Sequence, residues 1–216
     1  MKKYSTVIFD LDGTLLNTIE DLTNALNHTL QEFDMPTRTL PEVQSFVGNG
    51  LRLLLIRAIP QGEDNPQFEE VFAAFKTYYT DHCKEATAPY PGIMELLKTL
   101  QEHEIPMAIV SNKNDAAVKR LAAVFFEGII SVAIGERTGV RKKPAPDTVF
   151  TALEELGESA DSAVYVGDSE VDLQTAANSG MDCISVAWGF KGRAFLEKEG
   201  ASHIVDTPEE ILRFLI

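Results

Sequence analysis

Five short runs rich in valine and isoleucine recur along the chain, and they constrain its fold more than any other feature. They lie at residues 5–10, 106–111, 129–134, 163–167 and 183–187. Each run is almost continuously apolar, which is typical of strands that are covered on both faces. Helical patterns lie between or after them, at residues 93–102, 115–126, 146–156, 173–179 and 208–215. Strands that alternate with helices predict an α/β fold with a doubly wound, Rossmann-like parallel sheet.

Residues 16–81 interrupt this alternation, because they contain only helical signals. Thr18 and Asp21 form a capping-box pattern that predicts a helix to about residue 33. Three further helices are expected at residues 41–46, 51–58 and 65–82. We therefore expect two domains: a catalytic α/β core of residues 1–15 and 82–216, and an inserted all-helical cap of residues 16–81.

The charge of the chain excludes some classes of partner. The 216 residues include 33 acids against 19 bases, for a formal net charge of −14. Such a surface repels nucleic-acid backbones and anionic membranes, so neither is an expected partner. The two cysteines, Cys83 and Cys183, match neither a disulfide framework nor a metal motif. No signal peptide or membrane span is visible, and the cytoplasm is the expected location.

Polar residues follow four of the expected strands, where the ligands of an open α/β sheet bind. The first strand runs into Asp10-Leu11-Asp12-Gly13-Thr14. Asp10 is suited to act as a nucleophile, and Asp12 as a general acid and then a general base. Gly13 permits a sharp turn, so that the backbone amides of this segment, from Leu11 to Thr14, point inward at a phosphate. The alternative for this pattern alone is an acidic turn that caps the next helix.

The second and third clusters supply hydroxyl, amide and ammonium groups. Ser111, Asn112 and Lys113 follow the second strand and would bind a phosphoryl oxygen. Lys143 precedes a Pro-Ala-Pro segment and would neutralise charge on a phosphoryl group and on the nucleophile. Taken singly, Ser111 also suits a plain helix cap. Lys143 also suits a solvated lysine in a basic loop.

The fourth cluster, Gly167-Asp168-Ser-Glu-Val-Asp172, adds two carboxylates. Asp168 would bind a hard divalent cation together with Asp10 and the backbone carbonyl of Asp12. Mg²⁺ fits such a site of oxygen ligands. The alternative is that Asp168 and Asp172 only stabilise the start of a helix, where negative charge is favourable.

The combination of these motifs in this order closely resembles the haloacid dehalogenase-like superfamily of phosphohydrolases. Asp10-x-Asp12-Gly-Thr, Ser111, Lys143 and Gly167-Asp168-x-x-x-Asp172 match its four motifs, and the helical insertion matches its cap. The resemblance implies a Mg²⁺-dependent phosphatase in which Asp10 is the nucleophile and Asp12 the acid/base. It also implies that Ser111 and Lys143 hold the phosphoryl group, that Asp168 binds the metal, and that Asp172 supports it.

Within this superfamily the sequence is most similar to phosphoglycolate phosphatases. The cap segment Gly48-Asn49-Gly50-Leu-Arg52 carries part of that similarity, and it would face the bound substrate when the cap closes. Gly48, Asn49 and Gly50 also suit a simple break between helices.

The expected reaction is hydrolysis of a small phosphate monoester through an aspartyl-phosphate. Phosphoglycolate, pyrophosphate, nucleoside monophosphates and sugar phosphates remain open as substrates. A sugar phosphomutase would use the same two aspartates, and a catalytically silent binding module is the alternative from another class. The sequence leaves open whether the chain is a monomer or a homodimer.

Overall fold

The larger of two structural units is built around the first strand of the chain. The computed structural model describes residues 4–48 and 50–216. Contacts divide the chain into one unit that comprises residues up to Leu16 together with Pro89–Ile216, and a second unit, Asn17–Ala88. The chain passes between the units at β2 (Leu16–Asn17) and β3 (Ala88–Pro89), which pair with each other.

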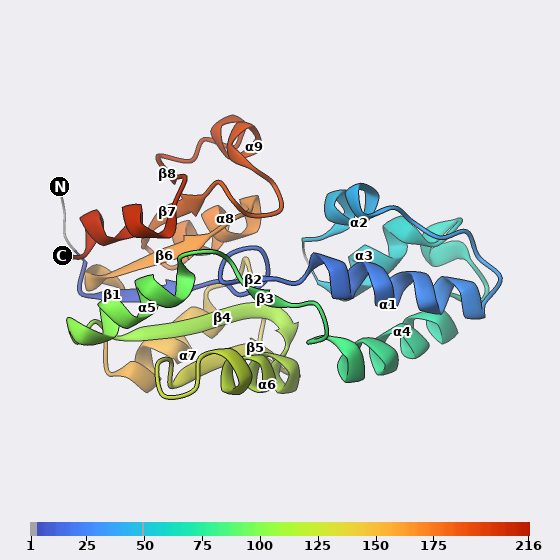
Figure 1. Cartoon of the computed structure of the whole chain (residues 1–216), viewed down its shortest axis with the longest axis horizontal. Helices are drawn as coiled ribbons and strands as arrows, with labels where there is room; N and C mark the ends of the chain where they lie inside the picture. Colours follow the sequence, from blue (N-terminus) through green and yellow to red (C-terminus); the bar gives the residue numbers. More distant parts are fainter. Residues whose placement is uncertain (1–3, 49) are drawn as a thin grey trace. The chain divides into compact units, whose positions relative to one another are not determined.

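The sheet of the larger unit is parallel and has six strands in the order β5-β4-β1-β6-β7-β8. The strands are β1 (Thr6–Phe9), β4 (Met107–Asn114), β5 (Val132–Glu136), β6 (Ala163–Gly167), β7 (Asp182–Val186) and β8 (His203–Val205). Counted along the chain, the spatial order is 3-2-1-4-5-6, which places the topological switch point between β1 and β6. Figure 1 shows β1 (blue) between β4 (green) and β6 (orange). Ligands of such sheets bind beyond the carboxyl ends of the strands at this point.

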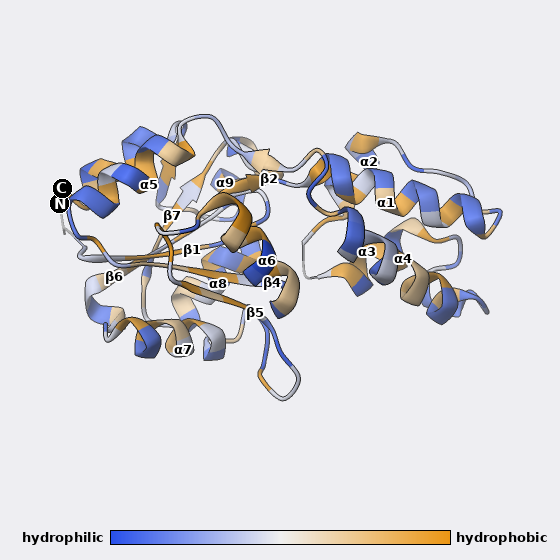
Figure 2. Cartoon of the chain, turned by 60° about the horizontal axis from the view of Figure 1, so that its bottom comes forward, coloured by the Kyte–Doolittle hydropathy of each residue, from blue (hydrophilic) through white to orange (hydrophobic). Residues whose placement is uncertain are grey.

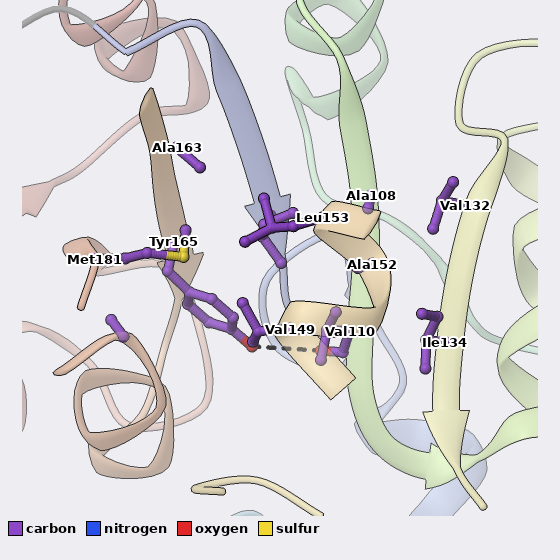
Figure 3. Close-up of a cluster of buried hydrophobic side chains, with 12 residues drawn as sticks. Ala108, Val110, Val132, Ile134, Val149, Ala152, Leu153, Ala163, Tyr165 and Met181 are labelled. Atoms are coloured by element: carbon purple, nitrogen blue, oxygen red, sulfur yellow. Dashed lines mark hydrogen bonds between the residues drawn. The ribbon is translucent and has the colours of Figure 1, made fainter. Parts of the chain in front are cut away.

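Helices cover the sheet and bury its apolar strands, which are largely orange in Figure 2. They are α5 (Ile93–Glu102), α6 (Asp115–Phe125), α7 (Asp147–Leu156), α8 (Glu170–Asn178) and α9 (Arg193–Lys198), with 3-10 turns η2 (Ala160–Ser162) and η3 (Pro208–Phe214). On one face, Val149 and Leu153 of α7 pack over Val110 and Tyr165 of the sheet (Figure 3). The predicted doubly wound α/β fold is thus confirmed.

Several local predictions for the larger unit differ from the structure. The edge strand β8 was not predicted, because its three residues, from His203 to Val205, carry little apolar signal. The strand expected from residue 129 begins at Val132, because the amides of Ile129 and Ile130 instead close a turn on the carbonyl of Phe126. The last predicted helix is the 3-10 segment η3. The short α9 was also not predicted.

The smaller unit is helical, as the sequence predicted. It contains α1 (Ile19–Glu32), α2 (Leu40–Phe46), α3 (Leu51–Ala58) and α4 (Phe68–His82), with a short 3-10 turn η1 (Gly62–Asp64). The helices α1 and α4 pack against each other along buried faces that include Leu26 and Phe75. Among the described residues of the chain, no helix combines the length and the apolar character that a membrane crossing requires.

The predicted capping box of α1 is wrong, and its residues have another role. The Thr18 side chain accepts no cap hydrogen bond. The Asp21 carboxylate instead accepts hydrogen bonds from the amides of Ala86 (2.8 Å) and Thr87 (2.9 Å). This contact ties the segment after α4 to α1, so the second boundary between the units lies at residues 88/89, where we had expected 81/82.

Candidate active site

The loop after β1 turns sharply and presents two carboxylates at the switch point of the sheet. The carbonyl of Leu11 accepts hydrogen bonds from the amides of Thr14, Leu15 and Leu16, at 3.3, 3.0 and 2.9 Å respectively. Gly13 has a φ of +86°, and a Cβ there would lie 2.5 Å from a carboxylate oxygen of Asp168. Only glycine therefore fits the turn that brings Asp12 round beside Asp10.

Lys143 is a buried ammonium with a partner for each of its three protons. Its Nζ lies 2.8 Å from Asp10 Oδ1 and 2.8 Å from Asp172 Oδ1, and it donates a hydrogen bond of 3.0 Å to the Tyr165 hydroxyl. The Lys143 side chain is only 3% exposed, so the alternative of a solvated lysine is wrong. Burial by itself would lower the pKa of Lys143, but the neighbouring Asp10 and Asp172 carboxylates hold it well above the usual value. Lys143 thus stays charged beside Asp10.

Asp172 orients Lys143 from the first turn of α8. Its Oδ2 accepts hydrogen bonds from the amide (3.1 Å) and the hydroxyl (2.6 Å) of Ser169. Its Oδ1 is bound to Lys143. Both carboxylate oxygens are therefore engaged, which fits the supporting role that was expected for Asp172. It also shows that the fourth motif does more than begin a helix.

Three buried carboxylates converge where a cation would bind. Asp10, Asp168 and Asp172 each place an oxygen within 4.8 Å of the others. Burial raises the pKa of Asp10 to about 7, with Lys143 opposing the rise and Asp172 adding to it. Burial, with Asp172 and Asp10 beside it, holds the pKa of Asp168 well above the usual value. One ammonium does not balance three carboxylates in a buried site, so the cluster has the charge that a divalent cation would neutralise.

The second motif is hydrogen-bonded to the first and third motifs. Lys113 Nζ donates a hydrogen bond of 2.8 Å to Asp12 Oδ1. Asn112 Nδ2 donates one of 3.0 Å to the Lys143 carbonyl. Lys113 is buried, and its amide donates to Ser111 Oγ at 3.1 Å. The structure thus gives Lys113 and Asn112 protein partners in addition to the phosphate that the sequence suggested.

Ser111 does not cap the following helix, so this alternative is also wrong. The strand β4 continues through Ser111 to Asn114 with an irregular register, and the Asn114 side chain caps α6 by accepting from the amide of Ala116 (3.1 Å). Ser111 therefore lies in the last part of β4, where its Oγ accepts from the amide of Lys113.

Sequence reasoning missed the loop after β7, which closes the same site. The Trp188 indole N–H donates to the Thr14 carbonyl at 3.0 Å, and the Phe190 amide donates to Asp168 Oδ2 at 2.7 Å. A Cβ on Gly189 would lie 2.5 Å from the carbonyl oxygen of Gly13. The signal was present, because this loop follows the fifth predicted strand at the same edge of the sheet. Tyr165 was also missed, since nothing in an apolar strand marks its hydroxyl.

The cap residues that the sequence suggested as substrate contacts are placed only in part. Gly48 and Gly50 have φ values of +113° and +90°, which suit a break between helices. Asn49 lies outside the described residues. Arg52 is bound within the smaller unit, here called the cap unit, to Glu63 (2.8 Å) and Glu69 (2.6 Å). Its guanidinium also lies over the rings of Phe68 and Phe72, 4.9 and 5.6 Å from their centroids. These contacts make Arg52 a link within the cap.

Asp10, Asp12, Ser111, Lys143 and Asp168 all lie within a stretch of sequence that matches a known family. The family model for haloacid dehalogenase-like hydrolases matches residues 7–186. The chain belongs to this family. The match includes all four motifs and the helical insertion between the first and the second.

Several similar proteins carry names that indicate the class of enzyme. A phosphoglycolate phosphatase of Pseudomonas syringae pv. tomato is 33% identical over 211 residues, which cover 93% of this chain and 75% of the relative. One from Aquifex aeolicus is 31% identical over 185 residues, 85% of each chain. The crystal structure of a proposed phosphoglycolate phosphatase from Lactobacillus delbrueckii subsp. bulgaricus is 39% identical, with a TM-score of 0.93 over 99% of both chains. Together with the family match, these relatives identify the chain as a phosphatase of the haloacid dehalogenase-like family.

Proposed function

We propose that this phosphatase hydrolyses 2-phosphoglycolate, or a phosphate monoester of similar size, through an aspartyl-phosphate on Asp10 with Mg²⁺ as cofactor. The observation that carries the proposal is the pairing of the two carboxylates Asp10 and Asp12 with two different buried lysines. Asp10 is bound to Lys143 and Asp12 to Lys113, both at 2.8 Å, at the switch point of the sheet. Two carboxylates with separate ammonium partners are suited to separate roles, one as nucleophile and one as acid/base.

The substrate proposal rests on the relatives and on charge. The relatives from Pseudomonas syringae pv. tomato and Aquifex aeolicus are named phosphoglycolate phosphatases. The net charge of −14 favours a small anion that a local positive site binds over a polyanion that spreads across the surface. The free thiols of Cys83 and Cys183 support a reducing compartment, and we propose the cytoplasm.

The residues present fit Mg²⁺. Asp10 and Asp168 would hold it, together with the backbone carbonyl of Asp12, and these are the hard oxygen ligands that Mg²⁺ prefers. Asp168 has no ammonium partner among the described residues, and its hydrogen bond comes from the Phe190 amide. When bound, Mg²⁺ would neutralise the charge on the phosphoryl oxygens and favour the ionised form of Asp10.

The chain's own residues account for both halves of the reaction. A carboxylate oxygen of Asp10 forms a bond to phosphorus while the bond to the alkoxide breaks, and Asp12 gives that alkoxide its proton. Asp12, now ionised, takes a proton from water as the water oxygen attacks the aspartyl-phosphate, which releases phosphate and restores Asp10. Lys143 stabilises the negative charge on the phosphoryl group, and the Ser111 hydroxyl donates to one of its oxygens. Lys113 keeps Asp12 in its position through both steps.

The decisive experiment measures phosphate release from 2-phosphoglycolate, with pyrophosphate, a nucleoside monophosphate and a hexose phosphate in parallel, with Mg²⁺ and without it. We expect kcat/KM to be highest for 2-phosphoglycolate and turnover to require Mg²⁺. Asp10→Asn should abolish turnover without changing the circular dichroism spectrum. An acid-quenched reaction of the parent should carry a phosphoryl group on the Asp10 peptide.

Two results would contradict the proposal. Equal phosphate release by Asp10→Asn and the parent would exclude Asp10 as nucleophile. A hexose phosphate whose phosphoryl group returns to the sugar at a second position would identify a mutase in place of a hydrolase.

A further inference from the structure

A groove of about 630 Å³ lies in the larger unit beside the segment that leads into α5. Its walls come from Tyr90 and the first turns of α5, from Trp188, and from the start of η3, which packs against α5. Leu96 and Pro208 are buried in these walls, while Tyr90 and Trp188 are half-buried. This volume lies within the range of small-molecule pockets, which are also mostly apolar. None of the three clustered aspartates of the active site lines the groove.

The charge on the groove walls selects the kind of ligand. Three carboxylates line it, from Glu95, Asp206 and Glu209, and its lining includes no lysine, arginine or histidine among the described residues. Asp206 is already bound to Arg193 at 2.8 Å. Glu95 and Glu209 take part in no ion pair within the described part of the chain. Two aromatic rings together with two uncompensated carboxylates are the groups that recognise an organic ammonium ion.

The groove is linked to the nucleophile loop by two hydrogen bonds. The Trp188 indole donates to the carbonyl of Thr14 at 3.0 Å, and the Tyr90 amide donates to the carbonyl of Leu15 at 3.1 Å. Thr14 and Leu15 close the turn that presents Asp10 and Asp12. A molecule that displaces the Trp188 ring would therefore move a group that holds this turn.

We propose that this groove is an effector site for a small organic ammonium ion. The apolar body of the ion lies against Trp188 and Tyr90, and its charge faces Glu95 and Glu209. Binding acts on phosphate release through the hydrogen bond from Trp188 to Thr14. The effect on activity rests on the proposed phosphatase function, whereas binding itself does not.

Binding is testable by fluorescence, because Trp188 is the only tryptophan of the sequence. The probes are choline and 3,3-dimethylbutan-1-ol, which has the same shape with carbon in place of the charged nitrogen. At constant ionic strength we expect choline to change the Trp188 emission saturably, and the neutral alcohol to bind about ten-fold more weakly. Equal binding of the two probes, or no saturable change with choline, would overturn the proposal.

Three variants locate the charge of the ligand. Glu95 and Glu209 are both exposed, so Glu95→Gln and Glu209→Gln should each weaken choline binding by about two- to five-fold, as expected for exposed ion pairs. Glu155→Gln, on the exposed side of α7 and outside the groove, is the matched control and should bind choline as the parent does. A similar loss in all three variants would show only a general effect of net charge, and would overturn the assignment to the groove.

The coupling to catalysis needs a separate measurement. Saturating choline should change kcat for the best phosphate ester in the parent, and the change should require higher choline concentrations in the Glu95→Gln/Glu209→Gln double variant, whose activity without choline stays that of the parent. Binding without any change in kcat would overturn the effector role. If the chain releases no phosphate from any ester, the proposed function fails, while the fluorescence titration still tests the site.

Discussion

The hydroxyl of Tyr165 offers a sharp test of how Lys143 is positioned. It accepts a hydrogen bond from Lys143 Nζ (3.0 Å) and donates one of 3.3 Å to the carbonyl of Val110. The ring lies in the buried cluster between the sheet and α7 (Figure 3). Tyr165→Phe removes the hydroxyl and keeps the packing of the ring. The ammonium then retains Asp10 and Asp172 as partners and leaves one buried proton without an acceptor.

The two consequences of Tyr165→Phe have different magnitudes. A hydrogen bond to a charged group contributes roughly 1.5–3 kcal/mol, and the longer bond to Val110 adds little, so we expect a loss of about 2 kcal/mol in the free energy of unfolding. For a chain of this size that corresponds to roughly 4–8 °C in Tm. In catalysis, an ammonium that has lost one of its three fixed contacts is less well placed for the transition state. We expect kcat to fall about ten-fold, or ~1.4 kcal/mol, with little change in KM.

The assay compares Tyr165→Phe with Tyr4→Phe, which makes the same chemical change elsewhere in the larger unit. Tyr4 is buried, and its hydroxyl donates to Asp182 Oδ2 at 2.6 Å, without contact to Lys143. Phosphate release gives kcat and KM, and thermal unfolding gives Tm. Only Tyr165→Phe should lower kcat, although both variants lose stability. Parental kcat in Tyr165→Phe, or the same fall in both variants, would refute a positioning role for the Tyr165 hydroxyl.

Three further predictions test other parts of the structure. Gly189→Ala places a Cβ against the Asp168 side chain. Because this displaces the Asp168 carboxylate, kcat/KM should fall about 100-fold while the circular dichroism spectrum stays native. Kinetics equal to those of the parent would show that the loop after β7 shifts to accommodate the methyl group. Because Arg52 is bound to two carboxylates of the cap, Arg52→Gln should lower the Tm more at low salt than at high salt. The KM should stay unchanged. A large rise in KM would instead indicate that Arg52 contacts the substrate. Tyr4→Phe removes a hydrogen bond to a carboxylate and should cost about 1.5–3 kcal/mol at neutral pH. Burial, with help from Asp182, raises the pKa of Tyr4 to about 12, so the folded state favours the neutral phenol. The stabilisation by the Tyr4 hydroxyl should therefore be complete below the ordinary pKa of about 10 and should fall as the pH rises to 12. A difference in stability between parent and variant that persists above pH 12 would contradict this.

The sequence predicted those parts of the fold that depend on local pattern. The runs of valine and isoleucine marked five strands, and their alternation with helices predicted the sheet. Elements with a weak pattern were missed, as in β8, whose three residues include the exposed His203. Asp21 shows a different limit. Its capping pattern is local, yet its carboxylate binds the amides of Ala86 and Thr87 across the cap unit, and no spacing rule within α1 indicates that partner.

For the candidate site, too, the sequence pattern predicted which residues belong to it but not which groups they contact. Spacing along the chain made Asp10, Asp12 and Lys143 candidate site residues, because the motifs follow strands that end at one edge of the sheet. Whether Lys143 is solvated or buried depends on groups from β1, β6 and α8, so the sequence left both alternatives open. From the sequence, Lys143 matched the third motif of the family, and Arg52 was suggested as a substrate contact in the cap. The structure separates them, since Arg52 is matched by two exposed carboxylates of the cap, and Lys143 by a buried Asp10.

The excess of acidic over basic residues in the chain is also found among the buried side chains of the candidate site. Asp10 shares the charge of Lys143 with Asp172, and Asp12 has Lys113, but the hydrogen bond to Asp168 comes from a neutral backbone amide. When these carboxylates are all ionised, the buried groups carry more negative than positive charge at the place where an anionic substrate has to bind. Under the proposed function, a cation held by Asp10 and Asp168 would relieve the repulsion of a phosphate ester, because uncompensated buried charge costs several kcal/mol. Substrate affinity and the stability of the site should therefore both depend on the same divalent ion.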